Sequence, residues 1–397
     1  MSKRYAVFLT VLFCAFLGVF FAANLITPER TFSPQENRYL TQRPSLSAED
    51  FRMRLPLRDS GDFFTGTFMS EFEQYITDQF VGRDGWIAAK AVAERALGKG
   101  ENNGVYLCAS DTLIPRFDRP DEKRVADNLN YVNKLVENVE IPVYFSLIPG
   151  KVSLWADRLP AGAPNADENA ILSQAEAATQ ANWVDIASVL RAHAGEEIYY
   201  RLDHHWTSLG AYYGYAALMD AMGLAAAPLD SYQRTTVSTD FNGTTFSTSG
   251  VRWMKPDSID IYVPEEGITA TTWSGTQPEE GVLYDWPKLE EKDKYAFFLG
   301  GNKPLTVLET AHTDAPKLLV VRDSYSDSLA PFLTADFSEV HLFDPRYNKT
   351  PLTQYIAEND IDQVLVLYSV ANFVTDSNLF VPVSYTHLRA HETDQYL

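Results

Sequence analysis

The chain contains very little cysteine. Two cysteines occur in 397 residues, Cys14 inside an N-terminal apolar run and Cys108 alone in the body of the sequence. So few thiols exclude a disulfide framework and a thiolate zinc site. We interpret Cys108 as a small buried apolar residue rather than a catalytic nucleophile, because an isolated cysteine usually behaves as a small hydrophobe.

Positive charge is also scarce. The sequence has 33 lysines and arginines against 53 aspartates and glutamates, which gives a formal net charge of −20, and it has no basic run. Such a chain repels polyanions and lacks the cations that neutralise phosphates, which excludes nucleic acid as a partner. The hydrophobic share of 45% and the length fit a globular protein of one large or two ordinary domains.

The segment Tyr5–Ile26 contains no charged residue. About 20 apolar residues suffice to span a bilayer core as a helix, whereas the apolar region of a signal peptide usually has about 7–15. Lys3 and Arg4 precede the segment, and the positive-inside rule places that end in the cytoplasm. We expect residues 1–27 to be a single-pass membrane anchor. A cleaved signal peptide is the alternative, and both interpretations give an extracytoplasmic protein.

The other end of the chain resembles a cloning or sequencing remnant. Residues Val383–Thr393, VSYTHLRAHET, resemble the translated read-through of a transposase sequencing adapter and show no clear hydrophobic period. We therefore expect the native sequence to end near Phe380–Pro382 and exclude residues 383–397 from the fold. No role is assigned to the side chains of this tail that could bind a metal, which are His387, His391 and Glu392.

Between these ends, residues 28–101 are expected to form a linker and then a helical region. Thr27–Glu49 has three prolines and little periodicity, and Phe63–Leu97 has apolar residues at helical spacing. This pattern predicts two helices that break near Gly82 and Gly85. The main domain is expected to run from residue 102 to residue 382.

The pattern of the main domain predicts an α/β fold. Val143–Ile148 is a continuous apolar run ended by Pro149-Gly150, as expected for a buried strand, and from Leu318 short apolar runs alternate with helical segments. Such alternation indicates βαβ units, a parallel sheet and three layers. In residues 232–313, β-branched and polar residues alternate among many glycines. We expect an inserted, largely antiparallel β region there.

Two short motifs carry groups capable of chemistry. Arg201–Ala211, RLDHHWTSLGA, leads into a predicted helix, and Val320–Tyr325, VVRDSY, lies where a predicted strand turns into a helix. Ligands of doubly wound sheets bind beyond the carboxyl ends of the strands. Ser324 falls at such an end, next to a helix N-terminus whose amides can stabilise an oxyanion.

The two motifs together supply the groups of a serine-based catalyst. A serine hydroxyl is a poor nucleophile until a base removes its proton. His205 can be that base, and Asp203, two residues earlier, can orient the ring and stabilise its charged form. The sequence therefore predicts Ser324 as nucleophile, His205 as general base and Asp203 as the orienting carboxylate.

Neighbouring residues are weaker candidates for oxyanion or substrate contacts. Gly301 and Asn302 could supply an amide and a side-chain donor, although a tight turn after a strand is the better interpretation of this segment. His204 is interpreted as structural or substrate-facing, and Trp206 as core packing rather than a platform for substrate. The remaining candidates flank Ser324 itself and are Arg322 and Tyr325.

The motifs also resemble those of a known family. DHHWTSLGA with VRDSYSDS resembles the DHHW family, itself similar to SGNH-like alginate O-acetyltransferases. FSPQENRYL, YITDQFVGRDGW, KVSLWADRLP and LVLYSVANF extend the resemblance over nearly all of Thr31–Phe380. The Asp-x-His-Trp and Ser motifs of those enzymes fall on Asp203, His205 and Ser324. Arg322 departs from the pattern, since glycine is usual there.

The resemblance implies both a fold and a function. The fold would be a three-layer, SGNH-hydrolase-like (flavodoxin-like) α/β domain. The function would be that of an extracytoplasmic O-acetyltransferase that acts on a cell-surface or exopolysaccharide through an acyl-serine. The implied acyl donor is a membrane-bound O-acyltransferase partner, and no cofactor and no metal is implied.

Three alternative functions are considered. A carbohydrate esterase would differ only in using water as acceptor, and the sequence does not separate the two. A non-catalytic polysaccharide-binding scaffold would suit the aromatic content of 13%, but the presence of all three catalytic side chains argues against it. Asp-His-His also occurs in manganese-dependent DHH phosphoesterases, which need further Asp-rich motifs. The other histidines before the tail, His193, His312 and His341, lack ligand spacing.

Overall fold

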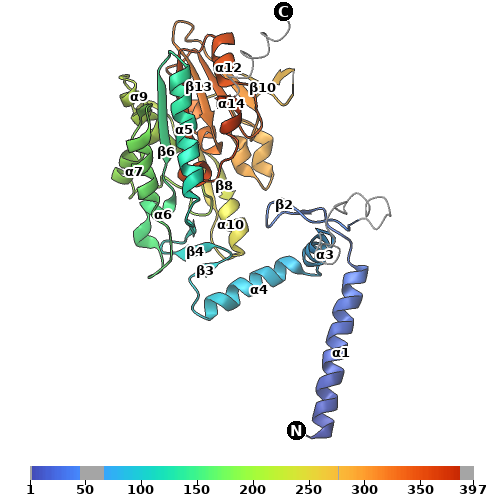
Figure 1. Ribbon diagram of the computed structural model, residues 1–397. Helices are drawn as coiled ribbons and strands as arrows, with labels where there is room; N and C mark the ends of the chain where they lie inside the picture. The colour runs from blue at the N-terminus through green and yellow to red at the C-terminus, as the bar shows by residue number, and fades with distance from the viewer. Residues whose placement is uncertain (1, 45–66, 276, 385–397) are drawn as a thin grey trace, which may run out of the picture. The chain divides into compact units, whose positions relative to one another are not determined.

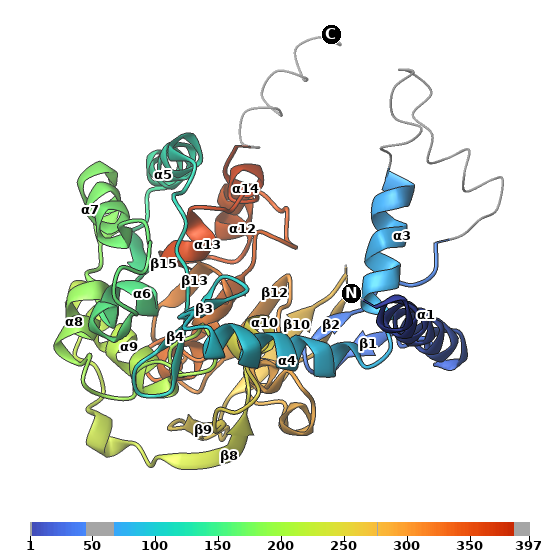
Figure 2. The same ribbon diagram turned by 90° about the horizontal axis from the view of Figure 1, so that it is seen from below.

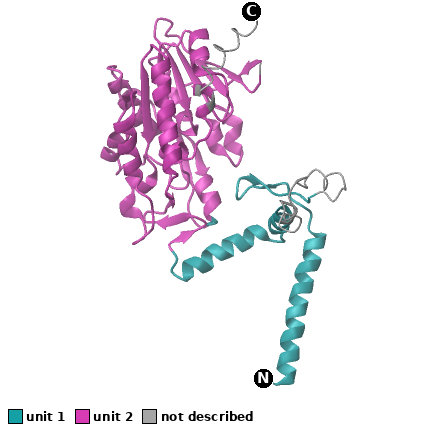
Figure 3. Ribbon diagram, viewed as in Figure 1, with its two compact units in different colours: residues 1–99, 250–252 teal, residues 100–249, 253–397 magenta. Residues whose placement is uncertain are grey.

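The computed structural model describes residues 2–44, 67–275 and 277–384. The chain forms two compact units, which Figure 3 draws in different colours. Unit 1 comprises residues 1–99 with 250–252, and unit 2 comprises residues 100–249 with 253–397.

Three parts of the sequence-based expectations lie outside the described residues. They are the end of the predicted linker, the start of the predicted helical region and the adapter-like tail from residue 385, with His387, His391 and Glu392.

The described residues of unit 1 form an apolar helix, a two-stranded hairpin and two further helices. Their bounds are α1 Lys3–Ile26, β1 Phe32–Ser33, β2 Arg38–Tyr39, α3 Thr67–Asp78 and α4 Arg83–Ala96. Helix α1, with a hydropathy of 2.6, is by length and composition able to cross a membrane. The hairpin lies inside the segment that we predicted as a linker. Helix α4 continues through Gly85, so the helices break before Arg83 only.

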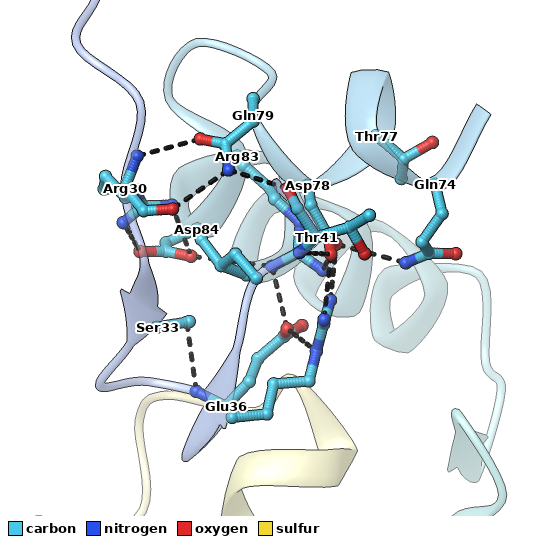
Figure 4. Close-up of polar contacts among 12 residues, drawn as sticks. Arg30, Ser33, Glu36, Thr41, Gln74, Thr77, Asp78, Gln79, Arg83 and Asp84 are labelled. Carbon is cyan, nitrogen blue, oxygen red and sulfur yellow. Dashed lines mark hydrogen bonds and ion pairs between the residues drawn. The ribbon is translucent and has the colours of Figure 1, made fainter. Parts of the chain in front are cut away.

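A buried carboxylate organises unit 1. Asp78 is fully buried and accepts hydrogen bonds from both terminal nitrogens of Arg38, at 2.9 and 2.5 Å. Arg38 and Arg83 each pair with Glu36 at 2.8 Å, and Figure 4 shows Glu36 and Arg83 gathered near Asp78. Burial alone would raise the pKa of Asp78, but Arg38 and the Thr41 amide hold this pKa well below its usual range. The FSPQENRYL and YITDQFVGRDGW segments therefore meet in one ionic network.

Unit 2 is built on an eight-stranded sheet with the order β11-β10-β12-β14-β13-β15-β6-β7. The strands are β6 Val143–Ile148, β7 Asn182–Trp183, β10 Thr269–Trp273, β11 Pro278–Glu280, β12 Leu305–Glu309, β13 Lys317–Arg322, β14 Glu339–Phe343 and β15 Gln363–Ser369. The strands from β14 to β7 are parallel, and β12, β10 and β11 extend the sheet antiparallel. The predicted α/β class with a mostly parallel sheet is thus confirmed.

The order of the parallel strands places a switch point beside β13. If β13, β14, β15, β6 and β7 are numbered 1 to 5, their spatial order is 2-1-3-4-5. This is the order of a flavodoxin-like sheet, here entered at its fourth strand. Strand order reverses between β13 and β15, and ligands of such sheets bind beyond the carboxyl ends of the strands at that point.

Helices cover both faces of this sheet (Figure 1), and Figure 2 shows α5, α12 and α14 on one side with α8 and α9 on the other. Their bounds are α5 Glu122–Asn138, α8 Ile186–Ala192, α9 Ser208–Ala221, α12 Leu352–Glu358 and α14 Phe380–Ser384. Helix α5 buries Val125, Leu129 and Val132, which recur at helical spacing and face the core. Because both faces are covered, the central strands are almost entirely buried and apolar.

The remaining elements of unit 2 are further helices and two small sheets. The α-helices are α6 Lys151–Leu154, α7 Glu168–Ala178, α10 Thr244–Ser249, α11 Ala330–Leu333 and α13 Val370–Phe373. The 3-10 helices are η1 Ala156–Arg158, η2 Leu229–Ser231, η3 Trp286–Glu290, η4 Lys294–Phe297 and η5 Ser324–Asp327. A three-stranded sheet consists of β3 Glu101–Asn102, β4 Val105–Cys108 and β5 Thr112–Pro115, and a separate pair consists of β8 Thr235–Phe241 and β9 Asp257–Ile261. The helix that we predicted to follow the strand at Val320–Tyr325 is divided into two short helices, η5 and α11.

The β-rich region predicted at residues 232–313 is antiparallel, but it is only partly a separate insertion. Strands β8 and β9 pair with each other. Strands β10 and β12 instead join the central sheet, where β12 pairs with β14. Four of the five residues of β12 are buried, so this strand buries its apolar side chains by joining the central sheet.

Helix α14 crosses the position where we expected the native sequence to end. It spans Phe380–Ser384, and Val383 is 3% exposed and belongs to the hydrophobic core. The first residue that we excluded is therefore packed with the domain.

Candidate active site

Ser324 lies at the carboxyl end of β13, at the switch point of the sheet. Every residue from Leu318 to Thr334 is buried except Ser324, which is partly exposed. The backbone N–H of Ser324 donates to no acceptor among the described residues. The serine therefore presents a hydroxyl and an unused amide at an otherwise closed edge.

Asp323 fixes this turn to the neighbouring strand. One carboxylate oxygen accepts the Tyr325 amide at 3.0 Å. The other accepts the amide of Ser369 at 2.9 Å, the hydroxyl of Ser369 at 2.7 Å and the side-chain amide of Asn372 at 2.7 Å. Because Ser369 ends β15, the carboxylate joins the ends of the two strands on either side of the switch point. Sequence analysis missed Asn372, although it lies in the LVLYSVANF segment.

His205 and Asp203 meet Ser324 from the loop before α9. Nε2 of His205 is 2.8 Å from Oγ of Ser324, and Nδ1 is 2.6 Å from Oδ1 of Asp203. The backbone N–H of His205 donates to the same Asp203 oxygen at 3.0 Å. The three residues predicted from the two motifs thus lie within hydrogen-bonding distance of one another in series, and His205 and Asp203 are 4% and 0% exposed.

The second oxygen of Asp203 is held by residues that sequence analysis missed. It accepts the amide of Thr244 at 2.7 Å and the hydroxyl of Thr244 at 2.9 Å. A Cβ on Gly243 would come within 2.2 Å of this oxygen, so only glycine permits the approach. Burial alone would raise the pKa of Asp203, but the two histidines and the hydrogen bonds from His205 hold this pKa well below its usual range. Asp203 is therefore ionised at neutral pH.

Tyr295 is a further neighbour of the site without a sequence signal. Its ring stacks on the His205 ring with 3.7 Å between centroids and an interplanar angle of 5°. Its hydroxyl donates to the carbonyl of Ser324 at 3.2 Å. The stacking limits rotation of the imidazole while both ring nitrogens stay engaged. Tyr325 packs on the other side of the loop, and its hydroxyl donates to the carbonyl of His204.

His204 and Trp206 differ in their surroundings. Nδ1 of His204 lies 2.6 Å from the Thr244 hydroxyl, and the side chain is 36% exposed. His204 therefore supports the Asp203 loop and also presents an edge to solvent. Trp206 is fully buried, and its indole N–H donates to the carbonyl of Tyr325 at 2.8 Å. A Cβ on Gly214 of α9 would be 2.8 Å from the indole, so Trp206 packs in the core, as the sequence interpretation favoured, and is not a substrate contact.

Arg322 faces away from the partly exposed edge. Its side chain is fully buried and pairs with Asp327 at 2.5 Å. It is therefore not a substrate contact, contrary to the tentative prediction. The guanidinium that replaces the usual glycine points to Asp327 of η5 and does not contact the Ser324 amide.

Gly301 and Asn302 lie in a tight turn. The Gly301 amide donates to the carbonyl of Phe298 at 3.2 Å, and the φ angles of Leu299, Gly300 and Gly301 are 60°, 70° and 84°. The carbonyl oxygen of the Asn302 side chain accepts from Arg346 at 3.1 Å. Within the described ranges, neither residue hydrogen-bonds to the catalytic candidates, and the turn is the interpretation that the geometry supports.

Asp203, His204 and His205 also form a group whose ligand atoms lie within 4.8 Å of one another. Most of these atoms are already engaged. Both oxygens of Asp203 accept hydrogen bonds, both ring nitrogens of His205 are bonded, and Nδ1 of His204 meets Thr244. A metal ion would have to break the contact between His205 and Ser324, so the donor set does not fit a metal centre.

Two cavities border the segment 116–120. A cavity of 710 Å³ lies between this segment and α7, and one of 430 Å³ lies between it and α13. The second cavity is lined by Ala371 and Val374, which flank Asn372 in the chain. Neither cavity is lined by Asn372 or by a residue of the relay.

Comparison with known proteins gives a family match and several structural likenesses. The model of the family described as DHHW protein matches residues 124–343, which is more than half of the chain. No curated protein sequence matches. A DHHW family protein from Eubacterium siraeum aligns with 71% of this chain and 95% of its own length, at 24% identity and a TM-score of 0.61.

Two further solved structures resemble unit 2. PatB1 of Bacillus cereus, solved with a sulfonyl adduct, aligns with 68% of this chain and 95% of its own length, at 19% identity and a TM-score of 0.55. The O-acetyltransferase domain of Pseudomonas putida AlgJ aligns with 69% of this chain and 93% of its own length, at 16% identity and a TM-score of 0.44. The likeness to PatB1 is one of fold.

Proposed function

The chain belongs to the DHHW family, and from that premise we propose that it is a serine acyl-transfer enzyme of the SGNH-hydrolase type. The observation that carries the proposal is the relay of Asp203, His205 and Ser324, with 2.6 and 2.8 Å between successive polar atoms. The relay lies at the switch point of a flavodoxin-like strand order, where ligands are expected.

In the first half-reaction, Ser324 becomes acylated. His205 takes the hydroxyl proton through Nε2 as Oγ attacks the acyl carbonyl, and Asp203 stabilises the imidazolium through Nδ1. The oxyanion that forms accepts a hydrogen bond from the unused Ser324 amide. Asn372 uses one N–H on Asp323 and has a second N–H that can serve the same oxyanion. His205 then returns its proton to the departing alcohol or thiol, which leaves acyl-Ser324.

In the second half-reaction, a sugar hydroxyl attacks the acyl-serine. His205 now removes the proton of the attacking hydroxyl and gives it to Oγ of Ser324, which restores the enzyme. The proposed acceptor is a cell-surface or exopolysaccharide, and the proposed acyl donor is a membrane-bound O-acyltransferase. The two cavities that border residues 116–120 are places where sugar units could bind, since they are lined by Phe117 and by polar side chains such as Arg116 and Arg124.

A carbohydrate esterase is the second candidate function. It would use the same acyl-serine with water as the attacking group. The partly exposed Ser324 favours keeping this candidate, because solvent reaches the hydroxyl. A non-catalytic polysaccharide scaffold is disfavoured by the intact hydrogen-bonded relay.

A sulfonyl reagent gives the direct test of this function, because a sulfonyl fluoride traps an activated serine. We expect phenylmethanesulfonyl fluoride to label the protein once, on Ser324, as seen by peptide mass spectrometry. An activated acetyl ester should leave acetyl on the same residue, and the yield should be the same after treatment with a chelator. No label on Ser324 at neutral pH, in a protein whose near-ultraviolet circular dichroism shows it folded, would contradict the proposed function.

We also propose that α1 anchors the enzyme in the cell membrane with unit 2 outside. The 24 residues of the helix extend about 36 Å, slightly more than a hydrocarbon core of about 30 Å. Its last turns pack within unit 1. The Phe20 ring stacks on Phe80 with 5.9 Å between centroids and lies 5.8 Å from Trp86, and the side-chain oxygen of Asn24 accepts the Val81 amide at 2.8 Å. These contacts support an uncleaved anchor, because cleavage after Ala23 would remove Phe20.

The anchor predicts how the full chain behaves in cells. The protein should stay in the membrane fraction after washing with high salt, because salt screens charges but does not expel an apolar helix. Detergent should release it, and its N-terminal peptide should still contain Lys3 and Arg4. Recovery of a soluble form that begins near Asn24 would instead establish a cleaved signal peptide.

A further inference from the structure

A lysine beside the Asp203 loop is buried on backbone carbonyls. Lys151, the first residue of α6, is 3% exposed. Its ammonium donates to the carbonyl oxygens of Leu113 at 2.5 Å, Tyr200 at 3.0 Å, Arg201 at 3.2 Å and Asp203 at 2.7 Å. An ammonium has three N–H donors, so four acceptors use all of them and two share a proton.

This environment is unusual for a buried cation. Among the described side chains, no carboxylate forms an ion pair with Lys151. Burial lowers the pKa of Lys151 to about 8, although the charges of Asp203 and Asp257 act in the opposite direction. Removing an ammonium from water is costly unless it is well hydrogen-bonded. The carbonyl oxygens supply that compensation, and three of the four belong to residues 200–203.

Lys151 connects this segment to rigid parts of unit 2. It follows β6 directly after Pro149-Gly150, and Leu113 lies in β5. The Leu113 amide also donates to the carbonyl of Arg201 at 2.9 Å. Strand β6 pairs with β15, whose last residue Ser369 is bound to Asp323. Lys151 follows β6 and Ser324 follows β13, and β15, which lies between these two strands, pairs with both of them.

We propose that Lys151 is a positioning residue: its ammonium holds residues 200–203 against β5 and the end of β6, and thereby sets the place of Asp203 and His205 relative to Ser324. The inference rests on the proposed function where it concerns turnover. The structural part, that the ammonium fixes the loop, stands independently of any reaction. Lys151 touches no reacting atom and acts only through the loop.

The substitution Lys151→Met removes the charge and the donors while keeping a chain of similar length. A catalytic group misplaced by about 1 Å can lose about 100-fold in rate. We expect kcat for a small acetyl ester to fall about 100-fold with little change in KM, and sulfonylation of Ser324 to slow by a similar factor. Lys134→Met, on the exposed face of α5, is the matched control and should stay within about twofold of the parent. Lys151→Gln, which keeps two donors without the charge, should be intermediate and covers the case in which Lys151→Met does not fold.

Hydrogen exchange separates positioning from general stability. In Lys151→Met or Lys151→Gln, amides of residues 198–207 should exchange at least tenfold faster, while peptides from β13 and α5 keep their parental rates. Unchanged exchange and labelling would overturn the proposal. Equal acceleration in β13, α5 and the loop, with full activity per folded molecule, would also overturn it, because Lys151 would then serve stability alone.

The pH profile gives a readout that a purely structural lysine would not move. The charged and titratable groups whose fields act between themselves and the ammonium are Asp203, Asp257, Cys108, Arg158 and His204, and burial raises the pKa of Cys108 to about 11. As pH rises through about 8, Lys151 loses its charge and one donor, so kcat of the parent should fall on the alkaline side. This alkaline limb should be absent in Lys151→Met, and a limb that persists there would overturn the proposal.

Failure of this proposal can be told from failure of the proposed function. If Ser324 of the parent protein takes no sulfonyl group, the acyl-transfer proposal fails. The exchange pattern of residues 198–207 would then decide the positioning role by itself. If Ser324 is labelled and the loop exchanges normally in Lys151→Met, only the positioning role is overturned.

Discussion

Substituting Ser324 or His205 by alanine should each abolish turnover of a small acetyl ester, with a loss in kcat of about 10⁶-fold, the order seen when a serine triad loses its nucleophile or base. Oγ of Ser324 and Nε2 of His205 lie 2.8 Å apart, so each group is of little use without the other. The folded state of Ser324→Ala should change little, because Ser324 is the one partly exposed residue of its segment, whereas His205→Ala removes a buried, stacked ring and should lower the melting temperature. Steady-state kinetics with matched thermal melting checks both expectations.

The double variant is the sharper measurement. Ser324→Ala with His205→Ala should be no more than severalfold worse than either single variant, since members of a triad act as a unit and their effects do not add. His204→Ala is the control from the same loop and should lose no more than about tenfold, because Nδ1 of His204 lies 2.6 Å from the Thr244 hydroxyl and 3.7 Å from Asp203, beyond hydrogen-bonding distance of the relay. Multiplicative losses in the double variant would contradict a shared relay, and retention of turnover in Ser324→Ala would remove Ser324 as nucleophile.

The parts of the fold that could be predicted from the sequence are those with local signals. Val143–Ile148 was predicted as a strand and has those bounds as β6, because a continuous apolar run ended by Pro-Gly specifies a strand that is buried on both faces. The β-rich region shows the limit of such reasoning. Alternating residues predict strands in it, but whether β12 pairs with β14 or with its own neighbours depends on contacts that are distant in sequence.

The same division holds for the candidate site. Asp203, His205 and Ser324 could be predicted because each lies in a short motif with a chemical purpose. Thr244, Tyr295 and Lys151 could not be predicted, because they lie in three other segments and come near the relay only in the folded chain. Thr244 contributes a backbone amide, Tyr295 a stacked ring and Lys151 an ammonium. Gly243 could not be predicted either, since a Cβ is excluded there only because Asp203 packs against it in the folded chain.

Two tentative candidates for substrate contacts belong to the core instead. Trp206 follows His205 and Arg322 lies two residues before Ser324, but closeness to a catalytic candidate in the sequence does not decide where a side chain points. Arg322 ends β13 and turns to Asp327, and Trp206 turns to the small residues of α9. Ser324 and His205 project into the same partly open space, while their neighbours belong to the core.

The substitution Asp203→Asn should lower kcat by about 10⁴-fold, the magnitude known for the equivalent change in a serine triad. Two backbone N–H groups point at different oxygens of Asp203, from His205 at 3.0 Å and from Thr244 at 2.7 Å. An asparagine has only one oxygen, so either orientation leaves one buried N–H facing an NH₂ group. With NH₂ toward His205, Nδ1 must accept and the proton moves to Nε2, where it prevents removal of the Ser324 proton. With oxygen toward His205, the tautomer is correct but the charge that stabilises the imidazolium is lost.

Nitrogen-15 NMR of the His205 ring distinguishes these two orientations, and kinetics on the same sample gives the loss in kcat. The buried unsatisfied N–H should also cost about 1–3 kcal/mol of stability, so a control with a similar structural cost is needed. Asp344→Asn provides it, because Asp344 is also fully buried and accepts the Arg346 amide at 3.0 Å and the Arg346 guanidinium at 2.6 Å, outside the Asp203 loop. It should lower the melting temperature comparably while kcat stays within about tenfold. If Asp203→Asn also stays within about tenfold while Ser324→Ala is inactive, Asp203 is not the orienting carboxylate.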